Sequence, residues 1–155
     1  MSNQNDTYRI GFSTIDITPP VGVYLAGFAA RTDPSIGVYH PLLSTSIVID
    51  DGSNPLVIVG AEILGFYSLT DATRRAISER IGIDPAHIIL NGSHTHCGPS
   101  IWDVDRVWCD EPDKNYVAEL IGKVADCTKQ AWDSREPVRL EFGSGECGIA
   151  AARRK

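Results

Sequence analysis

Apolar residues alternate or cluster in five short stretches of this chain and recur at helical spacing in two longer ones. Residues 44–50 and 56–61 are rich in β-branched side chains, and the turn-forming pairs Asp51-Gly52 and Asn54-Pro55 separate them, which predicts a hairpin. Further strands are predicted over residues 8–12, 87–91 and 138–142.

The two longer stretches predict amphipathic helices. Residues 69–81 place apolar side chains on one helical face, with Ser68 or Thr70 as the N-cap and Gly82 as the stop. Residues 116–132 repeat the pattern over more turns. The fold class is therefore α/β, with a mixed β-sheet and two main helices. We expect residues 1–7 to form a flexible tail and residues 8–155 a single domain.

Strand, helix and strand from residue 56 to residue 91 form a βαβ unit. Its crossover makes the two strands parallel and brings their carboxyl ends to one edge of the sheet. Glu62 follows the first strand and His94 the second, so we expect them to be neighbours. Functional groups of open α/β sheets gather at such edges. Glu62 is then either part of a site or a solvated, capping carboxylate.

His94 and His96 are the strongest chemical signal in the sequence. If the strand continues through them, residues i and i+2 share a face about 6 to 7 Å apart, so both rings can approach one metal ion. A catalytic zinc normally takes three protein ligands. His87 is seven residues away and too distant, whereas His40 stays open as a ligand. Cys97 is expected on the opposite face, as a small buried residue.

Composition narrows the classes of function. The chain has 155 residues, of which 43% are apolar and 22% charged, as in ordinary soluble proteins. Its net charge of −6 argues against nucleic acid or an anionic membrane as a partner. No apolar run reaches the roughly 20 residues of a transmembrane segment. The first seven residues do not resemble a signal peptide, so we expect a cytoplasmic protein with free thiols.

Loops account for the remaining candidates. Residues 23–40 form a long polar loop of the kind that often carries function. Residues 101–112 contain Trp102 and Trp108, which are interpreted as packed aromatic residues or as contacts with lipid or a partner.

Several segments together resemble the N-terminal part of the neutral/alkaline, non-lysosomal ceramidase family. Matching stretches follow in order and cover almost the whole chain: residues 16–20 (DITPP), 25–28 (LAGF) with Arg31 and Gly37-Val38, 57–65 (VIVGAEILG), 93–99 (SHTHCGP) and 143–149, followed by Arg153-Arg154. Each piece is short, and it is their combination that is specific.

The resemblance implies a zinc-dependent hydrolase of N-acyl, ceramide-like amide bonds. It makes His94 a zinc ligand and places His96 beside the ion as a catalytic contact to substrate or water. Glu62, from its expected place at the same edge of the sheet, is a second candidate catalytic group. Gly27 and Arg31 become substrate-binding residues. The metal would generate a hydroxide from bound water and polarise the amide carbonyl.

The chain departs from the family in length and at a few positions. The family takes its remaining zinc ligands from much later in a longer chain, so the resemblance implies an incomplete site and a fragment, with self-association through edges left exposed. The family usually has Ser at Cys97 and often His-Asp at Tyr39-His40. The alternative is a non-catalytic short paralogue or binding module. A metallo-β-lactamase-like site is disfavoured, because Gly98-Pro99 stand where those enzymes have Asp-His.

Overall fold

The computed structural model describes residues 8–101 and 112–149. Five strands form one mixed sheet in the order β4-β3-β2-β1-β5. They are β1 (Tyr8–Asp16), β2 (Leu43–Asp50), β3 (Leu56–Ala61), β4 (Ile88–Gly92) and β5 (Glu136–Val138). Neighbouring strands are antiparallel except β3 and β4, which are parallel as the βαβ unit predicted. The predicted α/β fold class is confirmed.

The predicted hairpin is formed by β2 and β3, with Ser44 opposite Ala61 and Ile47 opposite Ile58. Its turn is held by Asp51, whose Oδ1 accepts hydrogen bonds from the backbone amides of Ser53 (2.8 Å) and Asn54 (2.7 Å). These bonds stabilise the ionised carboxylate, so they lower the pKa of Asp51.

Both predicted helices are present. Helix α1 (Thr70–Ile81) follows a short 3-10 turn, η1 (Tyr67–Leu69), and ends at Gly82 in the left-handed conformation. Its predicted Ser or Thr N-cap is wrong: Leu69 occupies that position, and the Thr70 hydroxyl donates backwards to the carbonyl of Tyr67. Helix α2 (Lys114–Asp133) begins earlier than predicted, because Asp113 Oδ1 accepts hydrogen bonds from the first free backbone amides.

Three predicted strand boundaries are wrong. Strand β1 continues to Asp16 instead of stopping at residue 12, because β2 pairs with it from Arg9 to Asp16. The expected strand over residues 138–142 is replaced by β5, which ends at Val138. Val138 pairs with Tyr8, the first described residue of β1, so the described part of β1 offers no partner to the residues that follow. Strand β4 starts at Ile88, after the 3-10 turn η2 (Pro85–His87).

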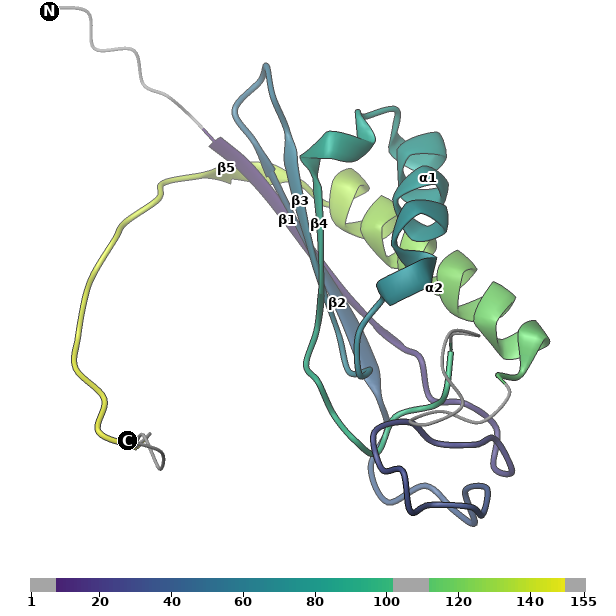
Figure 1. The fold of residues 1–155 in the computed structure, drawn as a ribbon. Helices are drawn as coiled ribbons and strands as arrows, with labels where there is room; N and C mark the ends of the chain where they lie inside the picture. The colour runs from purple at the N-terminus through teal and green to yellow at the C-terminus, as the bar shows by residue number, and fades with distance from the viewer. Residues whose placement is uncertain (1–7, 102–111, 150–155) are drawn as a thin grey trace, which may run out of the picture.

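Both helices lie on the same side of the sheet (Figure 1). Helix α2 packs on β1 and β2, and α1 packs on α2. Buried aliphatic side chains from strands and helices fill the layer between them, including Val48, Val57, Val59, Ile77, Ile88, Leu120 and Val124. Tyr116 of α2 is buried there and donates its hydroxyl to the carbonyl of Ile17 at 2.6 Å. Burial raises the pKa of Tyr116, so it stays a neutral hydrogen-bond donor.

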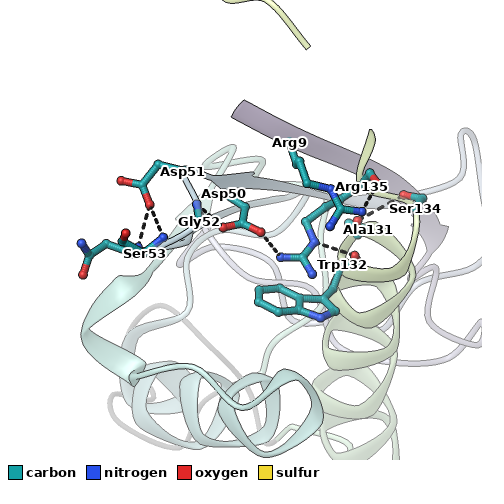
Figure 2. Close-up of polar contacts among 10 residues, drawn as sticks. Arg9, Asp50, Asp51, Gly52, Ser53, Ala131, Trp132, Ser134 and Arg135 are labelled. Carbon is teal, nitrogen blue, oxygen red and sulfur yellow. Dashed lines mark hydrogen bonds and ion pairs between the residues drawn. The ribbon is translucent and has the colours of Figure 1, made fainter. Parts of the chain in front are cut away.

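The carboxyl end of α2 is fastened to the hairpin by polar contacts, shown in Figure 2. Arg135 Nη1 donates to Asp50 Oδ2 at 2.6 Å, and its guanidinium lies 3.4 Å above the ring of Trp132. Arg9 of β1 donates to the carbonyl of Arg135 at 3.0 Å. These contacts join β1, β2 and α2 at one end of the sheet.

The opposite face of the sheet carries a row of apolar side chains that crosses four strands. Phe12 pairs with Ile47, Ile47 with Ile58, and Ile58 with Ile89. Phe12 is 61% exposed and Ile89 48% exposed, so the described residues leave this face partly open. None of the described helices is both long and apolar enough to cross a bilayer.

Candidate functional site at the carboxyl ends of β3 and β4

The histidine segment begins where β4 ends. After Gly92 the chain keeps its contact with the end of β3, because Ser93 donates to the carbonyl of Ala61 (2.9 Å) and His94 to that of Ile63 (3.1 Å). The parallel pair therefore places the backbone of Glu62 and that of His94 at the same edge, as the βαβ unit predicted.

His94 has an uncommon backbone conformation and a fixed ring. Its φ of 61° lies in the left-handed region, which few non-glycine residues adopt. Its Nδ1 lies 3.0 Å from the carbonyl oxygen of Leu64, so Nδ1 carries the proton and donates. The lone pair of Nε2 is then available to a ligand, which is the usual arrangement of a metal-binding histidine.

The two imidazoles lie together, although not for the predicted reason. The strand stops at Gly92, so His94 and His96 belong to a loop and turn, and the argument from strand alternation is wrong. Their ring centroids are nevertheless 5.1 Å apart, with the planes at 75°. A left-handed residue followed by a turn brings the rings side by side where a strand was expected to do so.

A second loop is paired with the histidine segment. Leu25 forms an isolated antiparallel bridge with Pro99. Ala26 donates to the carbonyl of Gly98 at 3.0 Å, and Ser100 donates to that of Tyr24 at 2.8 Å. Two segments that are more than 70 residues apart in the sequence thus form one unit.

Gly27 and Arg31 both act on His96. Gly27 has a φ of 101°, and a Cβ built on it would lie 2.6 Å from Cγ of His96, so only glycine allows the ring its place. Arg31 Nη2 donates to the carbonyl of His96 at 3.0 Å, and its guanidinium lies 5.0 Å from the centre of the Phe28 ring. Phe28 in turn meets the His96 ring edge to face, at 5.1 Å between centroids.

These contacts make Gly27, Phe28 and Arg31 the supports that orient His96. The expected binding of substrate by Gly27 and Arg31 stays a prediction. Phe28 was not singled out from the sequence, although it lies within the matching stretch 25–28. The Leu64 carbonyl was also missed, because every residue type presents a carbonyl and no sequence pattern marks this one.

The carboxylate of Glu62 binds the backbone of Leu43. Its Oε2 accepts a hydrogen bond from the amide of Leu43 at 2.7 Å, and its own amide donates to the Leu43 carbonyl at 2.9 Å. The capping interpretation of Glu62 therefore describes its contact. Its side chain lines a cavity that neither His94 nor His96 lines. A catalytic role for Glu62 stays a prediction.

The donor set fits a metal ion only in part. Within residues 8–101 and 112–149, no three His, Cys, Asp or Glu side chains form a group that could hold one. His94 is suited to be a single ligand, whereas a catalytic zinc takes three. His40 is exposed, lines the same cavity as Glu62 and lies with Nδ1 2.8 Å from the carbonyl of Pro41. Zinc therefore stays a prediction.

The expected burial of Cys97 is wrong. Cys97 is exposed and lines the cavity, because the turn after His94 replaces the strand that would have directed it inward. Cys97, Cys127 and Cys147 are free thiols, of which Cys127 is buried. Cys109, Trp102, Trp108 and the pair Arg153-Arg154 lie outside the described residues, as does the expected tail over residues 1–7.

Neither the family models nor the curated proteins searched contain a match to this chain. Solved structures do match. Neutral ceramidase from Pseudomonas aeruginosa superposes with a TM-score of 0.73 and 17% identity, over 86% of this chain and 23% of the ceramidase chain. A ceramidase complexed with C2 gives the same TM-score and identity, over 86% of this chain and 22% of its own. The chain thus has the fold of one part of these proteins and spans less than a quarter of their length.

Proposed function

We propose that this chain contributes part of the active site of a hydrolase that cleaves N-acyl amide bonds of ceramide-like lipids. The observation that carries the proposal is the ring of His94, whose Nδ1 is bound to the Leu64 carbonyl and whose Nε2 is left for a ligand. The ceramidase-like fold around it supports the reaction class.

The strained backbone of His94 also supports a functional site. A left-handed conformation at a residue other than glycine costs on the order of 1–3 kcal/mol and is retained mainly where function requires it. The bond to Leu64 and the amide bond to Ile63 hold the residue in that conformation. The imidazole is therefore oriented before any ligand arrives.

His94 would hold a zinc ion as one of its ligands, and the remaining ligands would come from polypeptide outside this chain. When bound, zinc lowers the pKa of a water ligand and polarises the amide carbonyl. The described residues provide the single ligand and its orientation, so we expect this chain alone to bind zinc weakly and to show little or no turnover.

His96 is proposed as the group beside the reacting amide. Gly27, Phe28 and Arg31 fix its position from one side, and His94 lies on another. An imidazole so placed can hold the carbonyl oxygen by a hydrogen bond or accept and return a proton. Both tasks depend on orientation, and the separate loop supplies three supports for it: the space left by Gly27, the ring of Phe28, and the bond from Arg31 to the backbone carbonyl of His96.

Zinc binding by matched histidine variants tests the proposal. We expect His94→Ala to weaken zinc binding at least tenfold in equilibrium dialysis followed by elemental analysis. His87→Ala, which removes an imidazole from η2, should leave it unchanged. Equal zinc binding by wild type and His94→Ala would refute the metal assignment.

Turnover is tested separately with an N-acyl sphingosine and mass detection of the released base. Little or no release is expected from this chain alone. The reaction class would be refuted if the chain, completed with downstream ceramidase-like sequence, bound zinc and still released no base.

A further inference from the structure

An open cavity of about 490 Å³ lies beside the histidine segment and is not used by the proposed reaction. Its walls come from segments distant in sequence, namely residues 18–20, Leu25, Ser35, residues 37–42, Glu62, Ser93, Thr95 and Cys97. Its volume falls within the roughly 300–1,000 Å³ typical of small-molecule sites. His94 and His96 do not line it, so it is a separate compartment at the same edge of the sheet.

The cavity wall carries a carboxylate. Glu62 supplies it, and the described lining contains no lysine or arginine. The imidazole of His40 also lines the cavity, with its Nδ1 2.8 Å from the carbonyl oxygen of Pro41. Oε2 of this carboxylate is taken by the Leu43 amide, whereas Oε1 accepts no hydrogen bond from the described residues. A cationic group entering the cavity is attracted to Glu62, and an anionic group is repelled.

Most of the remaining surface of the cavity is suited to hydrocarbon. Pro19, Leu25 and Val38 offer apolar atoms. The hydroxyls of Thr18 and Ser35 already accept hydrogen bonds, from the amides of Leu42 and Gly22 at 2.9 Å each. Polar side chains in the wall are thus partly satisfied by the fold itself, and Glu62 supplies the carboxylate that a ligand meets.

We propose that this cavity binds a long-chain alkyl amine in its protonated form, with the ammonium group at Glu62 and the alkyl chain along the apolar wall. The inference rests on the proposed function only for its biological meaning. Hydrolysis of an N-acyl amide gives a carboxylate and an amine, and the cavity charge selects the amine. Binding itself requires neither metal nor turnover.

The test uses the exposed thiol of Cys97, which lines the cavity, as its reporter. The chain is treated with a maleimide in the presence of decylamine, decanol or decanoate, each below its micelle concentration, and modified cysteines are quantified by mass spectrometry. Cys147 is also exposed and is absent from the cavity lining, so it serves as an internal control. We expect decylamine to protect Cys97 at about fivefold lower concentration than decanoate, as for a partly exposed ion pair, and to leave Cys147 unprotected.

Two variants separate charge from space. Glu62→Gln keeps an acceptor for the Leu43 amide and removes the charge, so the preference for decylamine over decanoate should fall to less than about twofold. Val38→Trp reduces the volume at an exposed wall position and should weaken protection by all three ligands alike. His94→Ala should change neither result, which keeps this proposal distinguishable from the proposed hydrolysis.

Equal protection by the amine and the carboxylate would overturn the proposal, as would an unchanged preference in Glu62→Gln. Protection that appears only above the micelle concentration, or extends equally to Cys147, would show an additive effect and would also overturn it.

Discussion

The two faces of the sheet have similar apolar patterns and different surroundings. Ile88 and Ile89 are consecutive residues of β4, and Ile88 is fully buried under the helices whereas Ile89 is 48% exposed on the other side. The row Phe12, Ile47, Ile58 and Ile89 is as apolar as much of the covered face. Burial is therefore decided by what covers a face, and alternation in the sequence does not reveal which face is covered.

The largest expected effect comes from mutating this isoleucine pair. Ile88→Ala should lower the free energy of unfolding by about 2–5 kcal/mol, because it leaves a cavity under α1 and α2. Ile89→Ala should cost less than about 1 kcal/mol, since water already reaches that side chain. Urea unfolding followed by circular dichroism measures both. Equal losses would mean that the open face is covered in solution, as the expected self-association would do.

A smaller effect is expected from hydroxyl pairs on the two faces. Ser46 and Thr128 share a buried hydrogen bond of 2.9 Å, and Thr128 also donates to the carbonyl of Val124. Thr128→Val leaves the Ser46 hydroxyl unpaired and should cost about 1–3 kcal/mol. Thr14→Val breaks the equivalent exposed pair with Thr45 and should change stability by less than about 0.5 kcal/mol, because water replaces the bond.

Combining the change at Thr128 with one at Ser46 tests the explanation. Ser46→Ala with Thr128→Val removes both hydroxyls and should recover most of the loss in thermal unfolding. An additive loss in the double variant would show that packing, and not an unsatisfied hydroxyl, determines the stability at this position.

The smallest expected effect is a dependence of stability on pH, caused by Asp16 at the end of β1. The side chain and backbone amide of Thr18 hold the pKa of Asp16 below its usual value of 3.8. The resulting stability is present above pH 3.8 and is lost as the pH falls through the lower pKa of the folded protein. Asp16→Asn should lower the melting temperature by about 1–3 °C at pH 7 and by nothing once the pH is below that folded value. A difference that stays constant with pH would contradict this assignment.

Helices and strand pairings could be predicted where a pattern within one segment of the sequence determines them. Helix α2 follows from its apolar period, and the parallel pairing of β3 and β4 follows from the helix between them. The prediction of a strand over residues 138–142 was wrong, because the extent of β5 depends on how far β1 reaches. That is a property of the partner strand and not of residues 138–142. Alternation predicts that a segment can pair, and the partner determines where pairing ends.

The sequence marks the residues of the candidate site but does not predict their arrangement. The spacing of His94 and His96 marked them, yet a φ of 61° and a turn bring the rings together. The interaction of Gly27 with His96 and the cavity at Glu62 both arise between segments far apart in the sequence. Such contacts have no local pattern, so a single sequence does not contain a signal for them.

The order of the strands also has a consequence for how the chain folds during synthesis. Strands β1 and β2 can pair early, but the helix that covers them begins only at Lys114, and β5 follows at Glu136. At roughly 5–20 residues per second, several seconds pass between completion of β2 and arrival of α2. During that interval both faces of the β1–β2 ribbon are bare, so the nascent chain is most prone to misassociation just before α2 emerges.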